Sequence, residues 1–142
     1  MKKIFTLVVF TLVLLPAFCQ IPKNNLGKTV QQLSSKFPNL EYSTTRDAFT
    51  EYESDGITFT FKNGKVVCES MMIDEGRAFG KDWFNAMYQS FKKTSYQRVT
   101  KPSDNDMCVT TVFYYSDFWI TLAYWHDDGL ATITYQNPDY FK

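Results

Sequence analysis

The single histidine of the chain lies beside carboxylates, in the segment His126-Asp127-Asp128-Gly129. A histidine next to an acid could act as a general base, but it also needs a positioned nucleophile. The chain contains no Gly-x-Ser-x-Gly segment, and no cysteine is close to His126 in sequence. Asp and Gly are also the residues that tight turns prefer. We therefore predict a polar hairpin end and no catalytic residue; the alternative is a small hydrolase with its site near His126.

Metal and phosphate chemistry have little support in the sequence. Asp104-Asn105-Asp106 offers oxygen ligands, but it lacks the downstream Gly and bidentate Glu of a calcium loop. The acids Glu51, Glu53 and Asp55 fit an exposed strand edge better than a pair of catalytic carboxylates. No glycine-rich phosphate loop is present, and three cysteines are too few for a four-cysteine zinc site. We predict neither a metal nor a cofactor.

Aromatic residues make up 18% of the chain, and their spacing near the C-terminus is informative. Residues 119–125 alternate as a β-strand does, so every second side chain points to the same side. Trp119, Thr121 and Trp125 therefore share one side, which faces threonines of the following strand. We predict that these three residues form a ligand-binding surface. The alternative is that a loop, the loose N-terminal lead-in over residues 20–28 or a second subunit covers them.

Two turn signals, Asn63-Gly64 and Asp128-Gly129, predict two β-hairpins. If both turns have two residues, the core side of the first hairpin pairs Phe61 with Val66, Phe59 with Cys68 and Ile57 with Ser70. The core side of the second pairs Tyr124 with Ile133 and Leu122 with Tyr135. Threonines lie on the opposite side of both hairpins, and we expect that side to face water.

The first residues predict a secretory leader. A positive start is followed by an apolar run over residues 4–15 and by Pro16, which is the three-part pattern of a signal peptide. We predict a signal peptide over residues 1–19, a cut before Gln20, and a secreted or periplasmic protein without a transmembrane span. The alternative is a lipid anchor on Cys19, but Pro16 and Phe18 depart from the lipoprotein pattern.

Removal of the leader would leave Cys68 and Cys108, one in each half of the chain. Cysteines tend to pair outside the cytoplasm, so these two are a candidate disulfide. Neighbouring strands often have poor geometry for such a bridge. The sequence therefore leaves open whether the two cysteines are bridged or free.

The remaining chain predicts a single α+β domain over residues 20–142. Each half contains a helical pattern, an irregular strand region and a tight hairpin, which indicates an internal repeat over about residues 26–73 and 80–136. We predict one antiparallel sheet with two helices packed on one face. The 15 basic and 15 acidic side chains give no net charge, which argues against nucleic acid as a partner.

The segment Leu26-Gly27-Lys28-Thr29-Val30-Gln31-Gln32-Leu33 and the later Phe61-Lys62-Asn63-Gly64-Lys65 resemble the β-lactamase-inhibitor-like unit and the small outer-membrane assembly lipoproteins. The resemblance covers about half of the chain after the leader. It implies a binding or scaffolding domain, sometimes in tandem, with no catalytic residues. We therefore expect a non-catalytic binding module for a protein, peptide or glycan outside the cytoplasm; an envelope assembly or scaffolding protein is a further alternative.

Overall fold

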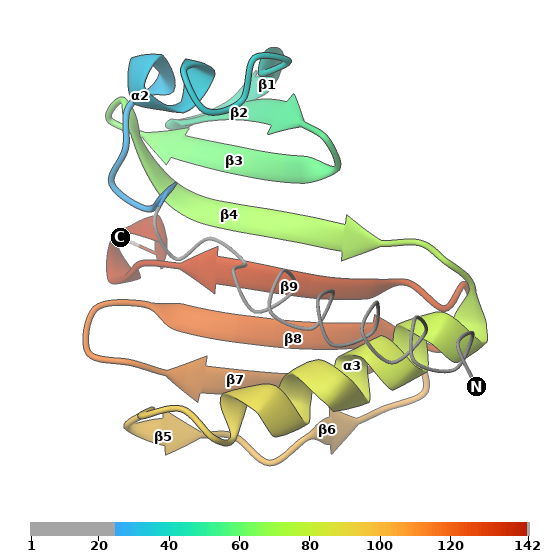
Figure 1. The fold of residues 1–142 in the computed structure, drawn as a ribbon. Coiled ribbons are helices and arrows are strands. Elements are labelled where there is room, and N and C mark those ends of the chain that lie inside the picture. The colour runs from blue at the N-terminus through green and yellow to red at the C-terminus, as the bar shows by residue number, and fades with distance from the viewer. Residues whose placement is uncertain (1–24, 142) are drawn as a thin grey trace, which may run out of the picture.

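The computed structural model describes residues 25–141, so the predicted leader lies outside the described residues. The described residues form one antiparallel sheet of nine strands with two α-helices, which confirms the predicted α+β class (Figure 1). The elements follow the order α2 (Val30–Ser34), β1 (Glu41–Arg46), β2 (Phe49–Ser54), β3 (Ile57–Lys62), β4 (Lys65–Ile73), α3 (Arg77–Phe91), β5 (Arg98–Val99), β6 (Ser103–Asp104), β7 (Cys108–Tyr114), β8 (Trp119–Trp125), β9 (Ala131–Gln136) and the 3-10 helix η2 (Pro138–Phe141).

The strands lie in the order β1-β2-β3-β4-β9-β8-β7-β5, and β6 also pairs with β7. The first four strands follow each other as a meander, as do β7, β8 and β9. The two groups meet where β4 pairs with β9, the last strand of the second group. The centre of the sheet therefore joins strands that lie far apart in the sequence (Figure 1).

Two apolar clusters form the core. The first joins α3 to the second group of strands and contains Trp83, Phe84, Met87, Phe113, Phe118, Ile120, Leu122, Tyr124, Ala131, Ile133 and Tyr135. The second lies beside α2 and contains Leu33, Phe59, Phe61 and Val66. Leu26, which precedes α2, packs against both clusters. A capping box starts α2, because the Thr29 amide donates to the Gln32 side chain while the Gln32 amide donates to Thr29 Oγ1.

The β3–β4 hairpin has the predicted turn, with positive φ angles at both Asn63 and Gly64. The predicted pairing of Phe61 with Val66 is also correct. Beyond that pair a bulge shifts the register by one residue, so the predicted pairs Phe59–Cys68 and Ile57–Ser70 are wrong. The actual partners are Thr60 with Cys68, Phe59 with Glu69, Thr58 with Ser70 and Ile57 with Met71. A one-residue shift exchanges the two faces of a strand, so Cys68 leaves the core side and Glu69 takes its place.

The β8–β9 hairpin has a longer turn than two residues, because the Trp125 amide donates to the carbonyl of Leu130 and the Gly129 amide donates to that of Trp125. The predicted register is therefore wrong by two residues. The actual partners are Ile120 with Tyr135, Leu122 with Ile133 and Tyr124 with Ala131. Because side chains alternate with period two, this shift leaves each side chain on the face that was predicted.

Candidate functional site

One face of the sheet carries a row of hydroxyl groups, and we call it the threonine face: Thr58, Ser70, Thr121, Thr132 and Thr134. The register aligns Thr58, Ser70, Thr134 and Thr121 on four adjacent strands. The Ser70 and Thr134 hydroxyls are 3.0 Å apart and share a hydrogen bond. All five side chains are half-buried, whereas their neighbours on the opposite side of the sheet form the core.

Trp119 lies on the threonine face, as predicted, but it is half-buried. Its ring meets that of Tyr114 edge to face, with 5.5 Å between the ring centroids. The Arg98 guanidinium lies 4.1 Å from the centroid of the Tyr114 ring. Sequence reasoning missed Tyr114 and Arg98, because the side to which β7 residues point could not be assigned before its partner strand was known. Together the three residues form a row of one cation–ring contact and one edge-to-face contact across β5, β7 and β8, which we call the aromatic ladder.

Trp125 is 38% exposed and also lies on this face, at the other end of β8. It lies six positions after Trp119, which is about 20 Å along a strand. Thr121 lies between them on the same face. The structure therefore places all three predicted residues on one face but does not bring the two tryptophans together.

Two segments could cover this face, the lead-in and the helix η2, and they lie on opposite sides of the sheet. The lead-in from Asn25 lies on the opposite side, where Asn25 contacts Glu69. The helix η2 folds back over one corner, and the Tyr140 ring lies 5.3 Å from that of Phe49, centroid to centroid. Phe49 pairs with Lys62 and is on the same side as Thr58. The described part of the lead-in therefore does not cover this face, which excludes that alternative for residues 25–28. The helix η2 covers the Phe49 corner and also packs against β4, and on this part of the face Thr60 and Cys68 are buried, although the sequence predicted that Thr60 faces water.

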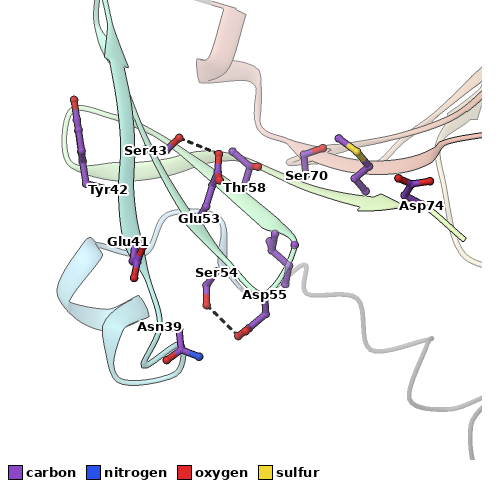
Figure 2. Close-up of a pocket in the computed structure, with 13 residues that line it drawn as sticks. Asn39, Glu41, Tyr42, Ser43, Glu53, Ser54, Asp55, Thr58, Ser70 and Asp74 are labelled. Carbon is purple, nitrogen blue, oxygen red and sulfur yellow. Dashed lines mark hydrogen bonds between the residues drawn. The ribbon is translucent and has the colours of Figure 1, made fainter. Parts of the chain in front are cut away.

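A hollow of about 670 Å³ adjoins the threonine face at the β1–β4 end of the sheet (Figure 2). Thr58 and Ser70 line both the hollow and the hydroxyl row. The wall also holds four carboxylates and no lysine, arginine or histidine: Glu41, Glu53, Asp55 and Asp74. Ser43 donates to Glu53 Oε1 at 2.9 Å, and Ser54 donates to Asp55 Oδ2 at 3.0 Å; both bonds are drawn in Figure 2. The hollow can therefore accept hydrogen bonds and attract positive charge.

The acids Glu51 and Glu53 do not lie on an edge strand, which corrects the sequence-based interpretation. They belong to β2, and β1 pairs outside it. Glu51 is half-buried as a result, whereas Glu53 and Asp55 are exposed. The edge position could not be read from the sequence because the irregular segment before β2 carries no clear strand periodicity.

The surroundings of His126 indicate a structural role. Its Nε2 lies 2.9 Å from Asp104 Oδ1, and its amide donates to the carbonyl of Met107. Asp104 is exposed and His126 is half-buried at the surface. Asn105 Oδ1 accepts hydrogen bonds from the amides of Met107 and Cys108, so the loop uses Asn105 to shape a turn. Within residues 25–141, no three His, Cys, Asp or Glu side chains are grouped to hold a metal ion.

Cys68 and Cys108 are both buried and free, so the candidate disulfide is not present. Cys68 is on β4 and Cys108 on β7, with β9 and β8 between them. Three strand spacings amount to about 14 Å, whereas the Cα atoms of a disulfide lie within about 7 Å. Burial raises the pKa of the Cys68 thiol to about 12, so this thiol is protonated and unreactive.

A buried carboxyl group, Glu69, is the polar feature that sequence reasoning missed. It is 1% exposed on the core side of β4 and accepts a hydrogen bond from Asn25 Nδ2 at 3.2 Å. Its second oxygen, Oε2, has no hydrogen-bond partner among the described residues. Burial raises the pKa of Glu69 to about 7, although Asn25 and the nearby Lys36 and Lys28 oppose the rise. No pattern in the sequence marks Glu69, because its position depends on the bulge in β4.

Comparisons with known protein families, with curated proteins and with solved structures found no match to this chain. Among the described residues, no helix has both the length and the apolar character needed to cross a membrane.

Proposed function

We propose that this protein is a non-catalytic binding module that works outside the cytoplasm and holds its ligand on the threonine face. The observation that carries the proposal is the continuity of this face. One register row leads from Glu53 in the acidic hollow, through the hydroxyl row, to Thr121 beside the aromatic ladder. The predicted leader over residues 1–19 supports a secreted or periplasmic location.

The size of this row favours an extended ligand. From Glu53 to Thr121 it crosses four strand spacings, which is about 19 Å. Hydroxyl groups can donate and accept hydrogen bonds, and the aromatic ladder offers ring surface for apolar contact. A peptide segment, a protein loop or an oligosaccharide has the length and the alternating polar and apolar groups to use both.

We further propose that the domain arose by duplication. Both halves contain a helix followed by antiparallel strands, and the halves meet through β4 and β9, their last strands. Equivalent turns also share a detail: Ser54 donates to Asp55 in the β2–β3 turn, and Ser116 donates to Asp117 in the β7–β8 turn. A tandem unit of this kind is what the resemblance to the β-lactamase-inhibitor-like unit implies, and that resemblance stays a prediction.

We infer in addition that both helices lie on the face opposite the threonine face. Phe59, in the cluster of α2, connects through its cross-strand neighbours Glu69 and Tyr135 to Ile120, in the cluster of α3. Residues joined in one such row point to the same side of a sheet. This arrangement leaves the other face available for a ligand.

Arrays of defined oligosaccharides and of peptides, probed with the exported protein, test the proposed function. We expect binding that Trp119→Ala and Thr121→Val each weaken at least tenfold. Phe79→Ala is the matched control, because Phe79 is an exposed aromatic on α3, away from this face. Ligands bound equally well by all variants would overturn the proposal, and so would the absence of binding on both arrays.

A further inference from the structure

Glu69 lies on the side of the sheet opposite the threonine face and takes no part in the proposed binding site. Its cross-strand partners are Phe59 and Tyr135, so apolar and aromatic side chains flank it on both sides. The side-chain amide of Asn25 donates to Glu69 Oε1, and Asn25 is itself fully buried. Glu69 Oε2 has no hydrogen-bond partner among the described residues. An ionised carboxylate with an unsatisfied oxygen is costly in such a place.

The segment that supplies Asn25 is the described part of the lead-in, residues 25–28. It lies along β4 beyond the end of β9, whose last residue in the pairing, Gln136, faces Cys68. The Gly27 amide donates to the carbonyl of Val66 at 2.8 Å, and the Val66 amide donates to that of Lys28 at 2.9 Å. The lead-in thus supplies hydrogen-bond partners for the backbone amide and carbonyl of Val66, which lies next to the bulge and beyond the last residue that pairs with β9.

The charged groups near Glu69 come from the lead-in and from the turn after α2. Lys28 Nζ and Lys36 Nζ donate to Asn25 Oδ1 at 3.3 and 3.4 Å. Their positive charges also act on the carboxyl through space and lower its pKa, but by less than burial raises it. On β4 itself the neighbouring Cys68 thiol is protonated, because burial raises its pKa to about 12.

We propose that Glu69 and Asn25 form a pH-dependent clasp, which holds the lead-in on β4 in acid and lets it detach as the pH rises. Below about pH 7, Glu69 in the closed state keeps its proton and is neutral. When the lead-in detaches, water reaches the carboxyl, its O–H bond breaks, and the proton passes to the solvent. Detachment also uncovers the amide and the carbonyl of Val66, which makes this part of β4 available for pairing with another strand.

The sign and the pH range follow from the two pKa values of Glu69. The closed-state pKa is about 7, whereas a hydrated glutamate in the open state has its ordinary pKa of 4.5. Below pH 4.5 both states are protonated, and above pH 7 both are ionised. Between these limits only the open state is ionised, so its population relative to the closed state rises about tenfold per pH unit. The total change is more than about 100-fold.

Hydrogen exchange of the Val66 amide in the exported protein tests the clasp. After correction for the intrinsic rate, we expect its opening constant to rise more than about 100-fold between pH 4 and pH 8. Glu69→Gln should remove this dependence, because an amide cannot ionise, whereas Glu75→Gln, at an exposed glutamate, should retain it. A pH-independent opening constant for wild-type Val66 would overturn the proposal, as would an unchanged profile in Glu69→Gln.

Two further measurements separate the clasp from global unfolding and from a failure of the variant to fold. The amide of Leu122, in the core of β8, reports global unfolding and should show a higher opening free energy than Val66. Identical opening free energies for the Val66 and Leu122 amides would overturn the proposal of a local clasp. In the wild-type protein, the NMR titration of the Glu69 carboxyl should have a midpoint near pH 7 and should coincide with the shift of the Val66 amide. A midpoint near 4.5 would equally overturn it.

Discussion

A carboxyl group in an apolar core reduces stability when it is ionised, because the charge loses its hydration. Glu69 is in this position, and its raised pKa has a consequence for the whole domain. The folded state holds the proton more tightly than the unfolded chain does. Glu69 therefore contributes its full stability below the unfolded pKa of 4.5, and this contribution is lost as the pH rises through about 7.

We expect Glu69→Gln to be more stable than the wild type at pH 8 by about 3 kcal/mol, which corresponds to the pKa difference. At pH 4 the two proteins should have nearly equal stability, since both side chains are then neutral. Denaturant unfolding at the two pH values measures this, with Glu75→Gln as the exposed control. The explanation fails if the variant gains no stability at pH 8.

Truncation of the two tryptophans should reduce the free energy of unfolding less than truncation of a core residue does. We expect Trp125→Ala to cost under about 1 kcal/mol, because the ring is partly exposed. Trp119→Ala should cost somewhat more, since its ring contacts Tyr114. Leu122→Ala, on the opposite side of the same strand and fully buried, should cost about 2–5 kcal/mol. Denaturant unfolding ranks the three; a Trp125 variant as unstable as the Leu122 variant would mean that this face is covered.

At the scale of elements, two glycines, Gly80 and Gly129, allow α3 to pack closely against the β8–β9 turn. A Cβ at Gly80 would lie 2.0 Å from the carbonyl oxygen of Gly129. Arg77, in the first turn of α3, also donates to the carbonyl of Asp127 in the same turn. The helix and the turn can therefore approach this closely only without a side chain at residue 80.

We predict that Gly80→Ala destabilises the protein by about 1–3 kcal/mol, because the added methyl group would push the backbone of α3 away from that of the β8–β9 turn. This is opposite to the effect of helix propensity, which favours Ala over Gly by about 1 kcal/mol. Asn85→Ala, at an exposed position of the same helix, should be neutral or slightly stabilising. Thermal or denaturant unfolding of both variants measures the difference; a stabilised Gly80→Ala would show that the helix can move away from the turn.

For the whole molecule, the strand order determines the state of the cysteines. We expect the purified protein, denatured without reductant, to show two free thiols from Cys68 and Cys108. In the folded state both should react slowly, because both are buried and burial raises the pKa of Cys68 to about 12. Thiol titration with and without denaturant measures both states. A denatured protein with no free thiol would contradict the strand order.

The predicted leader leads to a second prediction at this scale. The intact mass of the exported protein should correspond to a chain that begins at Gln20. A mass that includes residues 1–15 would contradict removal of the leader, and an added lipid mass on Cys19 would favour the alternative of a lipid anchor.

The sequence by itself determined the features that depend on neighbouring residues. Periodicity and turn chemistry were enough for the antiparallel α+β class, for the Asn63-Gly64 turn and for the side of β8 that carries Trp119, Thr121 and Trp125. These features rest on interactions between residues a few positions apart. Even the register error at the β8–β9 hairpin preserved the faces, since a shift of two residues equals the period of a strand.

Only the tertiary structure decided which distant segments meet. The pairing of β4 with β9 keeps Cys68 and Cys108 apart, and the lead-in that bonds to Val66 accompanies the bulge in β4. That bulge exchanges the two faces of the strand and moves Glu69 into the core, opposite to what alternation from the turn predicts. The physical reason is that a backbone hydrogen bond to a segment about forty residues away leaves no mark on the local pattern of side chains.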